Sequence, residues 1–538
     1  MRSAPEPRAT GKNRWHATAK PRDLVIMAAV LVAAVAAALV VVLGGNLTGG
    51  STGRPSGAAA GGGTASSGPS VRASAASRPN IVFVLTDDLS MDLLRFMPHV
   101  QAMERHGLTF SNYFVSDSLC CPSRASIFSG NFPHDTGVYT NVGAHGGFNV
   151  FHLRGEEQHT FATALQATGY RTAMMGKYLN GYLQPRARAA GVTDRYVPPG
   201  WSEWDVAGWG YPQFNYTLNE NGTLHYYGHQ PSDYLTDVLS RRGVHFINTS
   251  AATHKPFFLE VATFAPHTPY TPAPRDRNRF PGLTAPRRPS FDVAVSHPPD
   301  WLANHRALSA SQIAQINYVF RRRAQSVLAV DRMIGKLEQA LAAHGLARNT
   351  YLVFSSDNGY HMGDYRLMPG KLTVFDTDIR VPLVVIGPGV PAGTTTAAMA
   401  ENVDLAKTFT AIGSTSFAAD GHSLLPVLQG TQPANWRNAI LVEHEGPDSR
   451  LDAADFQEPG SGNPESYEAL RTSTFVYAEY KDGQREFYDL TTDPFELHNV
   501  AATLTPGQRA HLHAELLAIR RCHTGSACWA AMHVSSGP

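Results

Sequence analysis

The chain has 538 residues, of which 43% are hydrophobic, so it is long enough to bury a large core and is not a disordered protein as a whole. Its 45 Lys and Arg residues balance 44 Asp and Glu residues, and a formal net charge of +1 excludes a uniformly basic protein of the kind that binds nucleic acid. We therefore expect no nucleic-acid partner and only local anion binding.

The N-terminal region has the pattern of a membrane signal. Residues 1–23 are basic, and Leu24 to Leu43 then run without a charge, proline or glycine. Twenty helical residues rise about 30 Å, which matches the hydrocarbon core of a bilayer. The pattern predicts a cytoplasmic tail over 1–23, a membrane contact through an anchor over 24–43, and a single-pass protein with its catalytic domain outside the cytoplasm. The alternative is a cleaved signal peptide and secretion, although its apolar region is usually about 7–15 residues long.

Residues 44–77 are mostly Gly, Ala, Ser and Thr, which is typical of a flexible linker, so the globular part is expected to begin near Arg78. The chain has four cysteines, Cys120, Cys121, Cys522 and Cys528. In an oxidising compartment the last two could close a short disulfide loop. Adjacent cysteines rarely pair, because the bridge strains the peptide between them.

Strands and helices are expected to alternate through the first three hundred globular residues. The expected strands are Asn80–Leu85, Tyr170–Met175 and Tyr351–Ser355, and the expected helices lie between Pro98 and Gly107, over Thr160–Thr168 and over Arg323–His344. This order favours an α/β fold in which helices sandwich a large, mostly parallel sheet. We expect this domain to span 78–435.

The C-terminal hundred residues have a different pattern. Short strands are expected over Ala439–Val442 and Phe475–Tyr480, and a helix over Pro506–Arg521. Residues 436–538 are therefore predicted to form a smaller α+β subdomain.

Acidic residues follow two of the expected strands. Asp87 and Asp88 come after the first, and Asp357 and Asn358 come after the strand that ends near Ser355. Ligand sites in parallel sheets lie beyond the carboxyl ends of the strands. Three carboxylates and an amide oxygen suit a hard cation, Ca²⁺ or Mg²⁺. The alternative is that these are solvated residues of turns.

The segment Cys120-Cys121-Pro122-Ser123-Arg124 resembles the C-x-P-S-R motif of the sulfatase family, within the alkaline phosphatase superfamily. The resemblance extends over nearly the whole globular chain and is strongest to N-acetylglucosamine-6-sulfatases. The further matching segments are Gly176-Lys177-Tyr178-Leu179-Asn180, Ala265-Pro266-His267, Asp357-Asn358-Gly359-Tyr360-His361 and Gly370-Lys371. One departure is Leu179, where many sulfatases have a histidine.

The resemblance implies an alkaline phosphatase-like fold and a chemistry for each matching residue. A formylglycine-generating enzyme would oxidise Cys120 to formylglycine (3-oxoalanine), whose hydrate is the nucleophile, and a divalent metal would be required. The implied metal ligands are Asp87, Asp88, Cys120, Asp357 and Asn358. The implied catalytic side chains are Cys120, Arg124, Lys177, Lys371 and, as the acid for the leaving alcohol, His267, with His361 as a substrate contact.

The expected reaction is the hydrolysis of a sulfate ester, either of a sulfated sugar such as N-acetylglucosamine 6-sulfate or of an aryl sulfate. A phosphomonoester or phosphonate ester hydrolase of the same superfamily is one alternative, and a membrane-anchored binding protein without catalysis is another. Aromatic residues between Trp201 and Tyr227 either stack on a sugar or belong to the core.

Overall fold

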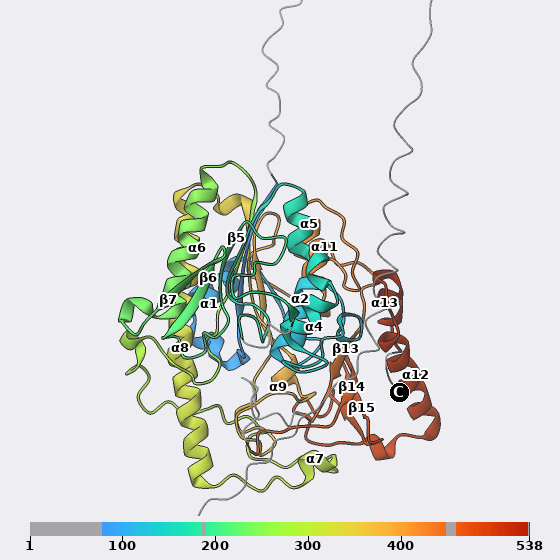
Figure 1. The fold of residues 1–538 in the computed structure, drawn as a ribbon. Coiled ribbons are helices and arrows are strands. Elements are labelled where there is room, and N and C mark those ends of the chain that lie inside the picture. Colours follow the sequence, from blue (N-terminus) through green and yellow to red (C-terminus); the bar gives the residue numbers. More distant parts are fainter. Residues whose placement is uncertain (1–77, 185–189, 448–458, 536, 538) are drawn as a thin grey trace, which may run out of the picture. The chain divides into compact units, whose positions relative to one another are not determined.

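The computed structural model describes residues 78–184, 190–447, 459–535 and 537. All of them belong to the second of the two compact units into which the chain divides, Ser74–Pro538. A ten-stranded sheet runs through this unit (Figure 1). Its order is β11 (Thr394–Thr396), β2 (Leu108–Phe110), β10 (Leu383–Ile386), β9 (Thr350–Ser356), β1 (Asn80–Thr86), β8 (Phe257–Ala262), β4 (Arg171–Lys177), β5 (Glu203–Ala207), β6 (Tyr216–Glu220) and β7 (Thr223–Tyr227).

The centre of the sheet is parallel. Strands β9, β1, β8, β4 and β5 are parallel neighbours, whereas β10 pairs antiparallel with both β2 and β9, and β6 and β7 form an antiparallel hairpin at the other end. The predicted α/β sandwich is thus confirmed, with antiparallel strands added on both sides of the parallel centre.

Helices cover both faces of the sheet, and β1 contributes side chains to each face. Ile81, Phe83 and Leu85 belong to one hydrophobic cluster, whereas Val82 and Val84 belong to the other. This alternation follows from the two-residue period of a strand. The first cluster includes residues of α2 (Cys120–Ser129), α5 (Phe161–Ala167) and α10 (Asp404–Ile412), and the second includes residues of α1 (Pro98–His106), α6 (Leu235–Ala251) and α8 (Ala310–Ala343) (Figure 1).

The bounds of most expected elements agree with the structure to within one or two residues, and α8 is the exception. It begins at Ala310, well before the predicted start at Arg323. Ser309 caps it: its side chain accepts a hydrogen bond from the Gln312 N–H, and the Gln312 side chain accepts one from the Ser309 N–H. This capping box stabilises a first part of the helix that has few buried residues, so hydrophobic periodicity did not reveal it.

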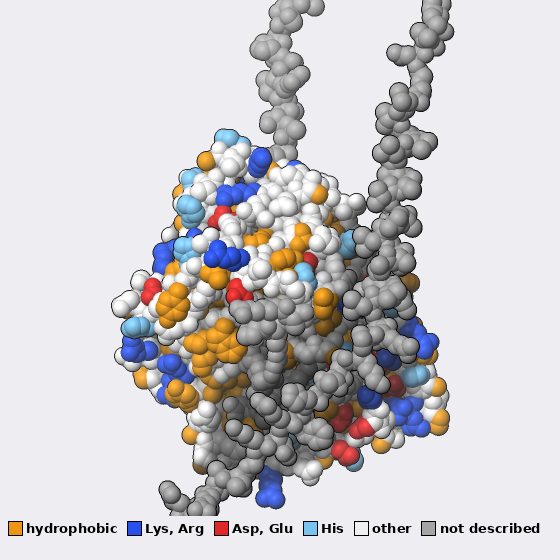
Figure 2. Space-filling view, in the orientation of Figure 1, with side chains coloured by type: hydrophobic (Ala, Val, Ile, Leu, Met, Phe, Trp, Pro, Cys, Tyr) orange, Lys and Arg blue, Asp and Glu red, His pale blue; other side chains and the backbone are white. Residues whose placement is uncertain are grey.

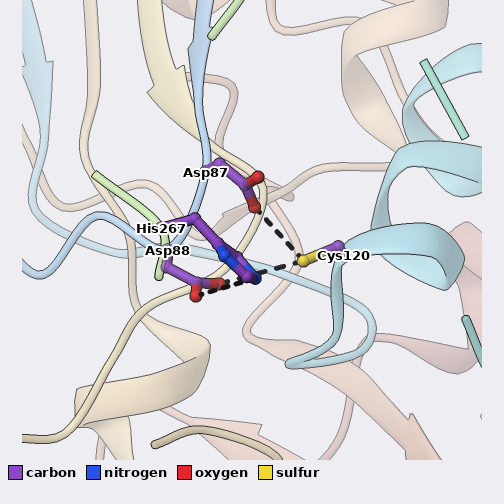
Figure 3. Close-up of side chains that lie close together, drawn as sticks. All are labelled: Asp87, Asp88, Cys120 and His267. Atoms are coloured by element: carbon purple, nitrogen blue, oxygen red, sulfur yellow. Dashed lines mark hydrogen bonds and ion pairs between the residues drawn. The ribbon is translucent and has the colours of Figure 1, made fainter. Parts of the chain in front are cut away.

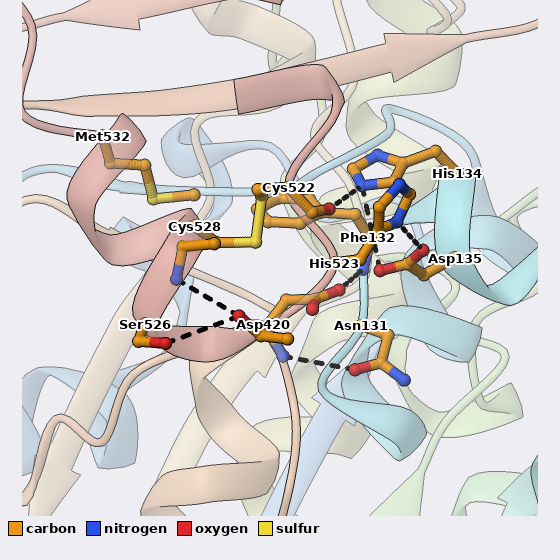
Figure 4. The surroundings of a disulfide bond; sticks show 12 residues. Asn131, Phe132, His134, Asp135, Asp420, Cys522, His523, Ser526, Cys528 and Met532 are labelled. Carbon is orange, nitrogen blue, oxygen red and sulfur yellow. Dashed lines mark hydrogen bonds and ion pairs between the residues drawn. A yellow bond between two sulfur atoms is a disulfide. The ribbon is translucent and has the colours of Figure 1, made fainter. Parts of the chain in front are cut away.

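The C-terminal α+β domain is also confirmed. Strands β13 (Ala439–His444), β14 (Tyr467–Thr472), β15 (Phe475–Tyr480) and β16 (Arg485–Asp489) form an antiparallel sheet in that order, with α12 (Pro506–Arg520) and α13 (Gly525–Ala531) beside it. Cys522 and Cys528, whose pairing the sequence left open, form a disulfide with their Cα atoms 4.9 Å apart (Figure 4).

The prediction of a single-pass membrane protein is corrected. In the described ranges, no helix combines the length and the apolar composition that a bilayer crossing requires. The segment Leu24–Leu43, the basic tail and the linker lie outside the described residues.

On the face drawn in Figure 2, basic and acidic side chains intermingle among neutral ones.

Candidate active site

Four neighbouring strands of the parallel centre carry polar residues to one edge of the sheet. Asp357 and Asn358 directly follow β9, and Asp87 and Asp88 directly follow β1. His267 lies in the loop after β8, and Lys177 is the last residue of β4. Because the strands are parallel neighbours, their carboxyl ends meet at the same edge. The sheet order therefore explains why residues 270 positions apart share one site.

The turn after β1 brings two adjacent carboxylates to the same place. Asp88 has a φ of 63°, in the left-handed region that Asp tolerates better than most residues. Its N–H donates to Asp357 Oδ1 at 3.1 Å. Extended backbone would point the two side chains to opposite faces. With this turn, Asp87 Oδ1 and Asp88 Oδ1 lie 3.2 and 3.8 Å from the sulfur of Cys120 (Figure 3).

Cys120 is the first residue of α2, a helix whose ten residues are all buried. The N–H groups of a helix N-terminus favour negative charge, which suits an ionised nucleophile. The ammonium of Lys371 lies 2.8 Å from the Cys120 sulfur and 2.6 Å from Asp88 Oδ1. Cys121, by contrast, has a pKa raised to about 12 by burial, so it remains a thiol at neutral pH.

Lys177 forms a buried ion pair with Asp87, with 2.7 Å between Nζ and Oδ2. Burial raises the pKa of Asp87 to about 6, although Lys177 opposes this. Burial lowers the pKa of Lys177, but the Asp87 carboxylate more than offsets this and raises it well above its usual value. The residue before Lys177 must be glycine, because a Cβ on Gly176 would lie 1.9 Å from the Ala262 carbonyl oxygen.

Arg124 holds the end of β9 against β4. Its Nε lies 2.8 Å from Asp357 Oδ2, and its Nη1 donates to the Lys177 carbonyl oxygen at 3.0 Å. Burial alone would raise the pKa of Asp357, yet Arg124, Lys177 and Lys371 hold it below its usual value. Asp357 is therefore ionised, and the contacts of Arg124 are to Asp357 and backbone.

His267 completes the group. Its Nδ1 lies 2.8 Å from the Thr268 carbonyl oxygen, so Nδ1 carries a proton and donates it there. Its Nε2 lies 3.6 Å from Asp88 Oδ2, and its ring packs against Tyr211 with 4.5 Å between centroids. The Nε2 atom is thus the one that faces the carboxylates (Figure 3).

The same residues suit a divalent cation. Ligand atoms of Asp87, Asp88, Cys120 and His267 all lie within 4.8 Å of one another. Asn358 donates its amide N–H to Asp88 Oδ1 at 2.8 Å, while its buried Oδ1 has no hydrogen-bond partner among the residues that the structure describes. Such an orphaned oxygen beside three carboxylates is the donor that a hard cation would satisfy. The Asp and Asn residues inferred from the sequence therefore fit a metal, and His267, which was expected only as an acid, adds a further ligand atom to the group.

His361 is placed differently from its predicted role. It is fully buried, with Nδ1 3.0 Å from both oxygens of Asp378 and Nε2 2.8 Å from the Ser461 carbonyl oxygen. Burial lowers the pKa of His361, but the Asp378 carboxylate has the larger effect and raises the pKa above its usual value. Both nitrogens are engaged within the protein, so these contacts give no support to a substrate contact.

Tyr211 belongs to the aromatic segment that was expected to stack on a sugar or to lie in the core, whereas Glu260 was missed from the sequence. Tyr211 lies between Lys177 and His267, with its ring centroid 5.1 Å from the Lys177 ammonium. Glu260 lies on β8, and the charge of Arg124 lowers the pKa of its carboxyl against the effect of burial. The signal for Glu260 was a lone acidic residue within the apolar strand FFLEVA. In the aromatic segment Trp204 is core, whereas Trp209 and Tyr226 are 48% and 69% exposed.

Comparisons with known proteins agree with the motifs. A family profile described as Sulfatase matches residues 79–413, and one described as N-sulphoglucosamine sulphohydrolase, C-terminal, matches 363–521. N-acetylglucosamine-6-sulfatase from Capra hircus is 34% identical over 490 residues, which cover 86% of this chain and 86% of that protein. The Homo sapiens protein of the same name is 34% identical over 485 residues, covering 85% and 87%.

Solved structures share the fold. A protein in complex with its substrate D-glucosamine-2-N,6-O-disulfate has a TM-score of 0.65 and 24% identity, covering 82% of this chain and 97% of that chain. Phosphonate monoester hydrolase of Agrobacterium radiobacter has a TM-score of 0.62 and 23% identity, covering 82% and 95%. At these identities the likeness concerns the fold alone.

Proposed function

The chain belongs to the sulfatase family and is a sulfuric ester hydrolase, and on that premise we propose that it removes the 6-sulfate of a sulfated N-acetylglucosamine, using a formylglycine made from Cys120. The observation that carries the proposal is the position of Cys120, at the N-terminus of α2 and within 4 Å of Asp87, Asp88 and Lys371. The choice of sugar rests on the names of the relatives.

The modified residue would supply a geminal diol, in which one hydroxyl attacks sulfur and the other later drives the release of sulfate. Cys120 is fully buried in the folded chain. The formylglycine-generating enzyme must therefore act before folding is complete, because the folded chain leaves it no access to the thiol.

Lys177 and Lys371 would bind the oxygens of the sulfate group. Both ammonium groups are buried and already lie among acidic groups, which keep them charged. In a site of low dielectric constant, the electrostatic interaction of such a charge with sulfate is stronger than in water. As negative charge builds on the sulfuryl oxygens, neither cation needs to move far from Asp87 or Asp88.

His267 would donate the proton that the leaving alcohol requires. Its Nδ1 proton is held by the Thr268 carbonyl, so Nε2 is the atom that exchanges a proton within the site. Asp88, 3.6 Å away, would stabilise the imidazolium form.

Asp87, Asp88, Asp357 and Asn358 would hold a Ca²⁺ or Mg²⁺ ion. When bound, the ion would act as a Lewis acid on sulfate oxygens and favour ionisation of the nucleophile. Arg124 would keep Asp357 ionised and oriented for this role.

A phosphonate or phosphate monoester hydrolase is the second candidate, since a phosphonate monoester hydrolase shares the fold. The rates on nitrophenyl sulfate and nitrophenyl phosphate separate the two. A sulfatase has the higher kcat/KM on the sulfate, and the opposite order would reject the proposal.

Mass spectrometry of the site peptide tests the nucleophile. Trypsin would release His106–Arg124, which contains both Cys120 and Cys121. In active protein this peptide should be lighter than the unmodified form, react with a hydrazine probe at position 120, and retain one alkylatable thiol at Cys121. An aldehyde at position 121, or full activity with an unmodified Cys120, would reject the proposal.

A further inference from the structure

A fully buried arginine, Arg323, extends from α8 to the end of β1. Helix α8 packs on one face of the sheet (Figure 1), and the Arg323 side chain is 0% exposed. Its Nη2 donates to the carbonyl oxygen of Asp88, but Nε and Nη1 have no hydrogen-bond partner within the described part of the chain. A buried cation with two unsatisfied N–H groups costs stability, so packing alone does not account for Arg323.

The backbone of Asp88 is held on both sides. Its N–H donates to Asp357 Oδ1 at 3.1 Å, and its carbonyl oxygen accepts from Arg323. The left-handed conformation of Asp88, with a φ of 63°, is strained for a residue other than glycine and persists only where surrounding contacts maintain it. Without Arg323 the carbonyl oxygen would lose this donor. Relaxation to extended backbone would then turn the Asp87 and Asp88 carboxylates to opposite sides.

Two tyrosines fix the same guanidinium beside other segments of the site. Arg323 Cζ lies 4.1 Å from the ring centroid of Tyr360 and 6.0 Å from that of Tyr270, and the two tyrosine hydroxyls are 2.8 Å apart. Tyr360 follows Asn358 by two residues, and Tyr270 follows His267 by three. The attraction between a cation and an aromatic face keeps the guanidinium in place. Arg323 is therefore fixed beside three of the segments that form the site.

We propose that Arg323 is a positioning residue of the metal centre, which holds the turn after β1 in the conformation that directs the carboxylates of Asp87 and Asp88 to one ion. The inference rests on the proposed function, in which these carboxylates bind a divalent cation. Arg323 donates to a backbone carbonyl, so the carboxylate oxygens stay available to the ion. Its positive charge by itself disfavours a second cation nearby. Any gain in ion affinity must therefore come from the geometry of the turn.

The test is a titration of the full chain with Ca²⁺ after chelation, in which Tm is measured at each free ion concentration. Arg323→Met removes the charge and the donors. It should need about 10–100-fold more Ca²⁺ for the same rise in Tm, the range typical of losing a group that orients a metal ligand. At saturating Ca²⁺ its kcat on nitrophenyl sulfate should approach that of wild type, because Arg323 contacts no reacting atom.

A conservative variant and a neighbouring arginine complete the experiment. Arg323→Lys keeps the charge and a donor but loses the planar group over Tyr360, so its Ca²⁺ affinity should lie between those of wild type and Arg323→Met. This variant also decides the question if Arg323→Met does not fold. Arg321→Met, at a partly buried position two residues earlier in α8, is the matched control and should bind Ca²⁺ as wild type does.

Three results would overturn the inference. One is Ca²⁺ binding by the Arg323 variants that is as tight as in wild type or tighter, since the charge alone would then determine the effect. Another is a lower Tm in chelator with an unchanged dependence on Ca²⁺, which would assign Arg323 to the stability of the fold. The third is a kcat that stays low at saturating Ca²⁺. If the Tm of wild type does not respond to Ca²⁺ or Mg²⁺, the proposed metal fails instead, so the two failures are distinguishable.

Discussion

The ammonium group of Lys371 lies 2.8 Å from the sulfur of Cys120, although 251 residues separate them. The same ammonium contacts Asp88 at 2.6 Å, so one buried cation bridges the nucleophile position and a carboxylate of the cluster. These two contacts hold the Lys371 ammonium in one position. In the proposed reaction, this places the charge where negative charge would develop during attack on sulfur.

Lys371→Ala should therefore lower kcat about 10²–10³-fold, the range typical of removing one preorganised electrostatic contact. Lys371→Arg should not restore wild-type activity, because a planar guanidinium does not fit the position of a compact ammonium. Steady-state kinetics on nitrophenyl sulfate measure the effect, with the exposed Lys255→Ala as the control. A kcat within twofold of wild type in Lys371→Ala would contradict the role.

Metal removal should abolish turnover, because the nucleophile and the sulfate oxygens would lose their Lewis acid. Activity after chelation should return with Ca²⁺ or Mg²⁺, and the ion should raise Tm in proportion to the logarithm of its concentration. Asn358→Ala removes the orphaned oxygen and should need more ion for the same rise in Tm. Full activity in protein that elemental analysis finds free of divalent metal would refute the metal requirement.

The acid role of His267 predicts a dependence on the leaving group. His267→Ala should lower kcat about 10²–10⁴-fold on a sugar sulfate, whose alcohol needs a proton to leave. On nitrophenyl sulfate the loss should be much smaller, because nitrophenolate leaves without protonation. Parallel kinetics on the two substrates give the comparison. Equal losses would mean that His267 acts on binding or on the metal, and not as the acid.

The strand ends were readable from the sequence because they depend on local patterns. A β-branched run followed by two acidic residues predicts both β1 and the position of Asp87 and Asp88, and β9 with Asp357 follows the same logic. A parallel centre then requires these groups to meet. The grouping of Cys120 and Lys371 with them came instead from the resemblance to a family, because no local pattern places a loop lysine against a helix N-terminus.

The sequence did not predict the contacts that depend on packing between distant segments. His361 lies three residues after Asn358, yet its ring contacts Asp378 and Ser461. Arg124, four residues after Cys120, forms its ion pair with Asp357. Glu443 and His134 form a 2.9 Å contact across 309 residues. Periodicity carries no information on such pairs.

Glu260 gives the last prediction, on stability. It lies on β8 between Leu259 and Val261, fully buried, and neither carboxylate oxygen has a hydrogen-bond partner among the residues described. Burial raises its pKa from 4.5 to about 8, with Arg124 opposing. Because the folded pKa lies above the unfolded one, the folded state binds the proton more tightly. The contribution to stability is present below pH 4.5 and is lost as pH rises to about 8.

Between those pH values the free energy of unfolding should fall by about 1.4 kcal/mol per pH unit through this one group. Glu260→Gln keeps the shape of the side chain but cannot ionise, so it should be close to wild type at pH 5 and clearly more stable at pH 8. Thermal unfolding of both proteins at the two pH values measures the difference in stability between variant and wild type. The other titrating groups are the same in both proteins, so their contributions cancel in this difference. A difference in Tm that does not change with pH, or a variant less stable than wild type at pH 8, would show that Glu260 is ionised and paired in the fold.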